Sequence, residues 1–118
     1  MPVNKRREGS RGENLAAEHL ERTGYRIIER NYRFDRGEID LIAEDGDELV
    51  FIEVKARRSD AFGPPEDAIT PQKQEQIKRV AEGYLFERQI EEQACRFDVV
   101  AITFNHGKAD IRVIRNAF

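Results

Sequence analysis

Residues 37–57, GEIDLIAEDGDELVFIEVKAR, have the pattern of a β-hairpin whose two arms contain acidic residues. Apolar side chains alternate with other residues on both sides of EDGDE, a segment rich in turn-forming residues. The sequence therefore predicts strands at 37–44 and 49–57. Asp40 and Glu53 lie within these strands, where a buried carboxylate needs a partner.

The turn of the hairpin decides which acids face each other. A loop centred between residues 46 and 47 puts Asp40 opposite Glu53, whereas a two-residue type I′ turn at 45–46 puts Glu38 there instead. In either register two carboxylates face each other with Cβ atoms roughly 4.5–5.5 Å apart. Like charges at that distance destabilise a sheet.

Strand geometry also predicts the faces of the hairpin, because side chains two positions apart share a face. Ile39 and Leu41 are expected together on the face opposite to Asp40. Glu53 and Lys55 are expected to point the same way. One face of the hairpin therefore carries acids and a cation, and the other face is apolar.

Paired carboxylates of this kind indicate a metal site. Folding must raise the pKa of one acid or supply a counter-charge. Oxygen ligands suit a hard divalent cation such as Mg²⁺ or Mn²⁺, and Lys55 could orient a water or stabilise developing negative charge. Such a site suits phosphodiester hydrolysis, in which a metal neutralises the phosphate and activates water. The alternative is that Lys55 and nearby arginines only pair with the acids on a solvated surface.

The rest of the chain predicts one α/β domain with the element order α-β-β-β-α-β-β. A mixed sheet is expected, built from a three-strand meander plus a strand reached by a helical crossover, with helices packed on the sheet. Thr70-Pro71 is a typical helix start, with an N-cap followed by proline. Ser10 is expected to cap the first helix. The remaining expected elements are a helix at 10–22, strands at 25–34 and 95–104, a loop at 58–69, and a last strand after NHGK.

Composition and charge fit a small intracellular domain. The chain has 118 residues, 39% apolar and 36% charged, with a net charge of −3, and this size suits one domain. Nucleic-acid-binding domains are usually basic overall, but here the charge is uneven, because residues 38–48 hold six acids and no cation. Residues 1–9 are expected to form a flexible basic tail and residues 10–118 the domain.

The cellular setting is expected to be the cytoplasm. Cys95 is the single cysteine, which excludes a disulfide framework and a cysteine-rich zinc site. No apolar run approaches the length of a membrane span, and MPVNKRREGS lacks the apolar stretch of a signal peptide.

The arrangement Asp40…Glu53-Val54-Lys55 resembles the signature of PD-(D/E)XK nucleases, and the element order resembles the core of that superfamily. More closely, the chain resembles the YraN family of uncharacterised bacterial proteins, whose relatives include archaeal-type Holliday junction resolvases. The segments that carry the resemblance are GENLAAEHL, GEIDLIA, FIEVKAR, AITPQK and RFDVVAI. One departure is that Ile39 stands where the superfamily's name has proline.

The resemblance implies a restriction-endonuclease-like fold and a metal-dependent endonuclease acting on DNA, with branched or structured DNA as one substrate class. Asp40, Glu53 and the backbone carbonyl of Val54 would bind Mg²⁺ or Mn²⁺. Lys55 would position or activate the attacking water, and Glu13 matches the helical glutamate that resolvases add to the site. A homodimer is implied as well, because resolvases act as dimers.

Two further acids have competing interpretations. Glu13 lies beside the apolar stripe of its helix and would lean toward Asp40. However, Ser10-Arg11-Gly12-Glu13 is also a capping-box pattern, in which Glu13 only closes the helix start. Glu38 would either join the metal through water or pair with Arg36.

Three cations are candidates for contacts with nucleic acid. Arg57 and Arg58 continue the strand that carries Lys55 and could grip phosphates. Lys73, in the first turn of the second helix, would contact phosphate or the acids, or it would only extend along the apolar surface.

Two other classes of function compete with the nuclease. One is a non-catalytic module on a nuclease fold that binds nucleic acid or protein. The other is a structural or regulatory protein without a nucleic-acid role, which the acidic balance of the chain favours.

Overall fold

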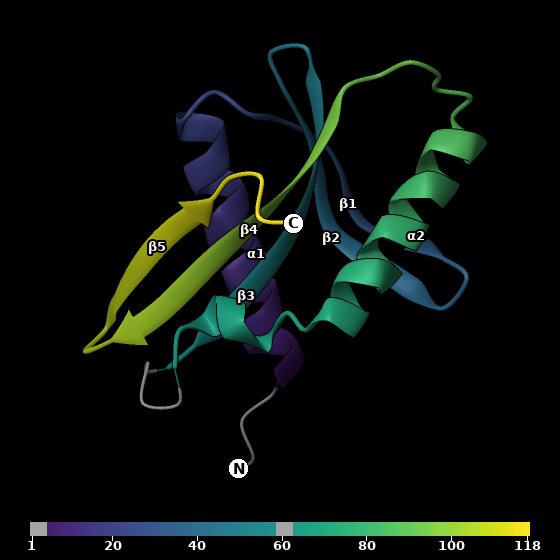
Figure 1. Ribbon diagram of the computed structural model, residues 1–118. Helices are drawn as coiled ribbons and strands as arrows, with labels where there is room; N and C mark the ends of the chain where they lie inside the picture. The colour runs from purple at the N-terminus through teal and green to yellow at the C-terminus, as the bar shows by residue number, and fades with distance from the viewer. Residues whose placement is uncertain (1–4, 59–62) are drawn as a thin grey trace.

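The computed structural model describes residues 5–58 and 63–118 and has the predicted order of elements (Figure 1). A short 3₁₀ helix, η1, lies within the predicted loop. Among the described residues, no helix is long and apolar enough to cross a membrane. The elements are α1 (Lys5–Arg22), β1 (Arg26–Phe34), β2 (Gly37–Asp45), β3 (Glu48–Arg57), η1 (Pro65–Ala68), α2 (Pro71–Glu87), β4 (Cys95–Asn105) and β5 (Lys108–Ile114).

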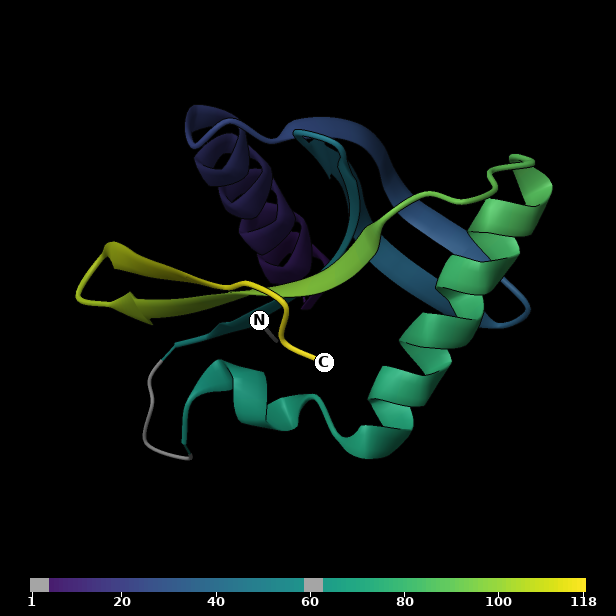
Figure 2. The same cartoon turned by 45° about the horizontal axis from the view of Figure 1, so that its top comes forward.

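The strands form one mixed sheet in the order β1-β2-β3-β4-β5. β3 and β4 are parallel and are connected through α2, whereas the other neighbouring pairs are antiparallel. The helices cover opposite faces of the sheet, with α1 behind it and α2 in front of it in the view of Figure 1, as the turned view of Figure 2 also shows. The predicted meander and helical crossover are thus confirmed.

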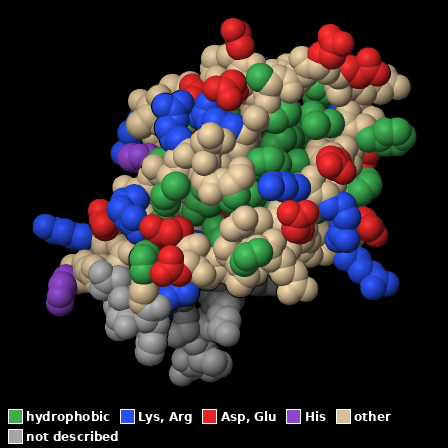
Figure 3. All heavy atoms as spheres, in the orientation of Figure 1, with side chains coloured by type: hydrophobic (Ala, Val, Ile, Leu, Met, Phe, Trp, Pro, Cys, Tyr) green, Lys and Arg blue, Asp and Glu red, His purple; other side chains and the backbone are tan. Residues whose placement is uncertain are grey.

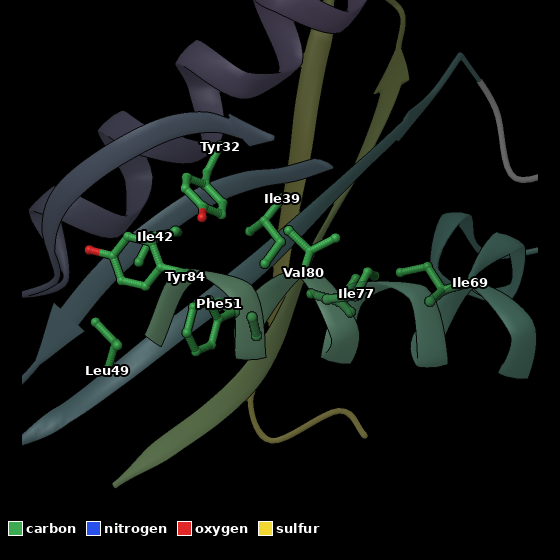
Figure 4. Close-up of a cluster of buried hydrophobic side chains, with 11 residues drawn as sticks. Tyr32, Ile39, Ile42, Leu49, Phe51, Ile69, Ile77, Val80 and Tyr84 are labelled. Carbon is green, nitrogen blue, oxygen red and sulfur yellow. The ribbon is translucent and has the colours of Figure 1, made fainter. Parts of the chain in front are cut away.

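Each face of the sheet has its own apolar core. Alternate residues of β4 illustrate this, because Val99 packs on the α2 side and Val100 on the α1 side. Figure 4 shows the α2 side, where side chains of α2 face those of β1, β2 and β3. On the same side, Figure 3 shows hydrophobic side chains gathered between β4 and α2 and surrounded by charged ones.

The start of α2 is the one predicted from Thr70-Pro71. The Thr70 hydroxyl accepts a hydrogen bond from the backbone N–H of Lys73, and Pro71 is the first helical residue. This cap fixes the N-terminal turn of α2 and therefore the position of Lys73. The buried stripe of the helix contains Ile77, Val80, Ala81 and Tyr84.

The start of α1 differs from the prediction. The helix begins at Lys5, so Ser10 lies within it and not at its start. Lys, Arg and Glu are good helix formers, and they extend a helix once its buried part has nucleated it. The predicted tail at 1–9 therefore overlaps α1 from Lys5, and its part at 1–4 lies outside the described residues.

The sheet divides at Asp40 and Glu53. Pairing between β2 and β3 ends at Leu41 and Ile52. Beyond that point β2 continues to pair with β1, and β3 continues to pair with β4 as far as Arg57. The two pairs of strands diverge, and in Figure 1 the end of the β1–β2 hairpin passes α2 while β3 runs toward η1. We call the opening between them the fork.

The faces predicted for β2 are wrong at the fork. Ile39 packs in the α2-side core, whereas Leu41 packs in the α1-side core, and Figure 4 shows Ile39 beside Val80. The neighbouring strand, β1, is irregular beside the same residues. Arg30 pairs with Leu41 and Tyr32 with Ile39, and Asn31 between them has a φ of 55° in the left-handed region. Regular alternation breaks at this residue.

The opposite end of the sheet is held by a buried ion network around Arg96 and Asp98. The Arg96 guanidinium donates to Asp98, Asp45 and the Tyr25 hydroxyl, and that hydroxyl donates to Asp98 at 2.8 Å. The backbone N–H of Asn116 also donates to Asp98, at 2.9 Å. Asp98 is thus part of a structural salt bridge with Arg96. The charges of this network are mutually satisfied.

The contact between α2 and β1 leaves no room for a side chain at Gly83. A Cβ atom there would lie 2.5 Å from ring atoms of Phe34. We expect Gly83→Ala to destabilise the protein by about 1–3 kcal/mol through overpacking, although alanine is the better helix former by about 1 kcal/mol. Urea unfolding of the wild type, Gly83→Ala, Phe34→Leu and the double variant measures the change in the free energy of unfolding.

In the Gly83 experiment, Phe34→Leu should recover part of the loss in the double variant. Glu82→Ala, at an exposed neighbouring position, is the matched control and should change stability by less than about 0.5 kcal/mol. An unchanged stability of Gly83→Ala would contradict the close packing.

Candidate functional site

The fork brings together Asp40 and Glu53. The pairs Asp45–Glu48 through Leu41–Ile52 correspond to a loop centred between residues 46 and 47, so the first of the two predicted registers is correct. Asp40 Oδ2 accepts a hydrogen bond from the backbone N–H of Val54 at 2.8 Å. A side-chain carboxylate thus replaces the backbone carbonyl that this N–H would need in a continuous ladder.

Burial disfavours a charge on these two acids. Only 5% of Glu53 is exposed, and burial, reinforced by the nearby Asp40 carboxylate, raises the pKa of Glu53 to about 8. Burial also raises the pKa of Asp40, against the opposing effect of the Val54 N–H. Because the pKa of Glu53 is about 8, the pair retains a proton at neutral pH.

Two lysines from different elements reach Glu53. The ammonium groups of Lys55, on β3, and Lys73, in the first turn of α2, each lie 4.0 Å from Glu53 Oε1. About a third of each lysine side chain is exposed, so both can still meet a ligand. Lys73 was predicted to contact phosphate or the acids, and the structure places it beside the acids.

Glu13 approaches the site from α1. Its Oε1 is buried without a hydrogen-bond partner, and burial, followed by the charge of Asp40, raises its pKa. The capping-box interpretation is wrong, because α1 begins at Lys5 and Glu13 lies well inside the helix. Gly12 allows the approach, since a Cβ atom there would lie 3.3 Å from that of Ala56.

Glu38 lies at the edge of the site and pairs with a different arginine from the predicted one. Its Oε2 is 3.7 Å from Nε of Arg33, its cross-strand neighbour. Arg36 lies in the turn between the strands with a φ of 66°. The negative charge of Glu38 still contributes to the raised pKa of Asp40 and of Glu13. We call Glu13, Glu38, Asp40, Glu53, Lys55 and Lys73 the fork site.

The predicted arginines Arg57 and Arg58 lie outside the fork site, at the end of β3. They line a pocket of about 160 Å³ together with Arg11, Ala56 and Phe104. Arg11 and Phe104 were not among the predicted site residues. Their contribution depends on how α1 crosses the end of the sheet, which no local sequence signal reports.

The fork site fits a hard divalent cation that is held by two carboxylates and completed by water and phosphate. Among the described residues, three buried side-chain polar atoms lack a hydrogen-bond partner, and two of them, Glu13 Oε1 and Glu53 Oε2, belong to this site. In the same described part of the chain, no three His, Cys, Asp or Glu side chains are placed to hold a metal ion. Mg²⁺ needs only one or two carboxylates when water and substrate phosphate complete its shell. Asp40 and Glu53 suit that mode.

A hollow beside α2 adjoins the fork site at Lys73. It has a volume of about 660 Å³ and is lined by the N-terminal half of α2. Lys73 belongs both to this lining and to the surroundings of Glu53. A ligand in the hollow would therefore meet Lys73.

Comparisons with known proteins identify relatives along nearly the whole chain. A family model described as "Uncharacterised protein family UPF0102" matches residues 12–102. A UPF0102 protein of Symbiobacterium thermophilum is 51% identical over 96% of this chain and 97% of its own. Those of Syntrophus aciditrophicus and Moorella thermoacetica are 47% and 44% identical, over 95% and 100% of this chain and 88% and 100% of their own.

The protonated carboxyl pair predicts that the metal-free protein loses stability as pH rises from about 5 to about 8. Folding raises the pKa of Glu53 from its ordinary 4.5 to about 8, so the folded state binds more protons in this window. Each pKa unit corresponds to about 1.4 kcal/mol, and we expect a loss of a few kcal/mol. Denaturant unfolding in EDTA across this range measures it.

Glu53→Gln should remove most of this pH dependence, because glutamine does not titrate. Glu82→Gln, on the exposed side of α2, should leave it unchanged. Parallel stability curves for the wild type and Glu53→Gln would contradict the raised pKa.

Proposed function

The chain belongs to the UPF0102 family, as its resemblance to YraN proteins predicted, and we propose that it is a metal-dependent endonuclease that hydrolyses DNA phosphodiester bonds. The observation that carries the proposal is the fork site. Two facing carboxyl groups are buried and one of them has a pKa of about 8, two lysines lie 4.0 Å from that one, and buried carboxylate oxygens lack partners. Such an arrangement costs stability, which a site for a cation and a phosphate explains.

The resemblance to PD-(D/E)XK nucleases supports the same reaction. Asp40, Glu53 and Lys55 occupy the positions of that signature, and Glu13 corresponds to the helical glutamate of archaeal-type Holliday junction resolvases. By the same resemblance, branched DNA is the proposed substrate and a homodimer the proposed assembly, since two strands would then meet two fork sites.

A bound Mg²⁺ or Mn²⁺ would neutralise charge on the scissile phosphate and lower the pKa of a water. Asp40 and Glu53 would hold it, with the backbone carbonyl of Val54 as a third proposed ligand. Glu53 must lose its proton to do so, and its pKa of about 8 makes binding compete with protons near neutral pH.

The lysines and Glu13 have distinct proposed roles around these acids. Lys55 follows Glu53 on the same strand and would orient the attacking water by donating a hydrogen bond to it. Lys73 enters from the α2 side, where it lines the hollow, and would stabilise negative charge on a phosphate oxygen. The partnerless Oε1 of Glu13 would accept a hydrogen bond from water and so help fix its position.

A non-catalytic binding module is the second candidate. The observation in its favour is that Lys55 and Lys73 already supply positive charge beside Glu53. In this case the acids and lysines form a structural ion cluster, and DNA or protein binds elsewhere on the same fold. Cleavage by purified protein separates the two candidates.

The metal-binding prediction concerns Asp40 and Glu53. We expect calorimetric titration to detect Mn²⁺ binding by the wild type and at least tenfold weaker binding by Asp40→Asn and by Glu53→Gln. The same samples should cleave four-way-junction or duplex DNA only when the wild type and the metal are both present. Asp47→Asn, in the exposed hairpin turn, is the control and should behave as the wild type.

Asp40→Asn should still bind DNA, because the phosphate-binding cations remain. Tight DNA binding without cleavage by the wild type in Mg²⁺ and in Mn²⁺ would favour the binding module and reject the nuclease.

The Glu13 prediction tests the contribution of α1. Glu13→Gln should lower the cleavage rate about 10–100-fold, the usual range for groups that support a metal site. Glu18→Gln provides a matched control on the same helix, since Glu18 is exposed and pairs with Arg22. Equal cleavage rates for the two variants, with both folded by circular dichroism, would remove Glu13 from the site.

A further inference from the structure

The pocket at the end of β3 has a composition suited to an anion. The described residues of its lining are three arginines, one alanine and one phenylalanine. We call this lining, Arg11, Ala56, Arg57, Arg58 and Phe104, the arginine pocket. The guanidinium of Arg11 lies over the ring of Phe104, 4.8 Å from its centroid, and this cation–π contact holds its position.

The arginine pocket and the fork site are coupled through one turn of α1. Gly12 brings this turn against Ala56 of β3. Its neighbour Glu13 reaches the surroundings of Asp40, and its other neighbour, Arg11, lines the pocket. One close approach of helix to strand therefore positions a group in each place.

The size of the pocket limits its ligand. A volume of about 160 Å³ lies well below the roughly 300–1,000 Å³ of pockets that enclose whole small molecules. One phosphate group with part of its water shell fits this description. Arginine is the side chain best suited to bind it, because its planar group can donate two hydrogen bonds to phosphate oxygens.

The position of the pocket relates it to the fork site. Arg57 follows Glu53 by four residues on β3, which corresponds to about 13 Å at roughly 3.3 Å per residue. Along one strand of duplex DNA a phosphate occurs about every 3.4 Å of helix axis. A DNA strand that reaches the acids can therefore also reach the pocket, a few nucleotides away.

We propose that the arginine pocket binds an internal backbone phosphate of the DNA strand that enters the fork site, with Arg11 as a phosphate ligand and Phe104 as the residue that positions Arg11. The assignment of the strand rests on the proposed nuclease function. The phosphate contact itself requires neither metal nor cleavage, so it can be measured without them.

The experiment measures DNA binding by the full chain in EDTA. Binding is detected by fluorescence anisotropy at several salt concentrations. The probe is a labelled duplex with a single-stranded extension. Arg11→Ala should weaken binding about tenfold and reduce the slope of log affinity against log salt by about 0.7–0.9, the value for one lost phosphate contact. Arg112→Ala is the control. Arg112 lies on β5 and pairs with Glu66 at 2.7 Å, so its replacement should change neither the affinity nor the salt slope.

Phe104 is tested through its dependence on Arg11. Phe104→Leu should weaken binding about threefold, as expected from loss of a cation–π contact. The double variant Arg11→Ala/Phe104→Leu should bind no more weakly than Arg11→Ala alone. Additive losses would show that Phe104 does not act through Arg11 and would overturn its positioning role.

The source of the phosphate is decided by modified probes. Neutral methylphosphonate linkages at internal positions should abolish the difference between the wild type and Arg11→Ala, whereas removal of a 5′-phosphate should not. The reverse result would overturn the internal site in favour of a terminal phosphate.

The two proposals fail differently. Equal salt slopes for Arg11→Ala and Arg112→Ala, with cleavage by the wild type, would overturn the pocket and leave the nuclease intact. A reduced slope for Arg11→Ala without cleavage by the wild type would support the pocket and reject the nuclease. Absence of DNA binding by the wild type at low salt would overturn the pocket directly.

Discussion

The hydrogen bond from the Val54 N–H to Asp40 Oδ2 is the interaction on which the rest of the site depends. A sheet that divides leaves backbone groups without partners, and a buried unpaired N–H is costly. Asp40 supplies the missing acceptor from its side chain. The strands can therefore separate at this level without that cost, and the carboxylate that allows the separation is held in the opening it creates.

The fork also explains why elements far apart in the sequence meet there. β1 and β2 lean toward α2, which fixes Lys73 through the Thr70 cap. β3 stays with β4 and carries Glu53 and Lys55 along its edge. α1 closes the other side because Gly12 lets it approach Ala56. Each element thus brings one or two charged groups to a place where continuous pairing would have left no space.

Most of the fold could be predicted from the sequence, because the information is local. Alternation identified the hairpin, and Thr70-Pro71 marked the start of α2. The predictions were incomplete where several segments compete for one position. The hairpin register depended on turn geometry that its residues left open, and the face of Ile39 depended on a left-handed residue, Asn31, in the adjacent strand.

The helix start shows a different limit of sequence analysis. Ser10 and Glu13 form a valid capping pattern, but the other residues of α1 and the sheet beneath them decide where the helix begins. The proximity of Glu13 to Asp40 and of Arg11 to Phe104 follows from that packing. A resemblance to a family could indicate Glu13, whereas nothing in the sequence connected Arg11 with Phe104.

Buried charged groups have hydrogen-bond partners at one end of the sheet and lack some of them at the other end. Arg96 balances Asp98 with several hydrogen bonds, whereas Glu53 and Glu13 retain oxygens without partners. In a laboratory selection for heat resistance alone, mutations in the Arg96 network would be purged, while neutral replacements of the fork acids would accumulate. Natural relatives that retain these acids would then be under selection for the function of the site and not for the stability of the protein.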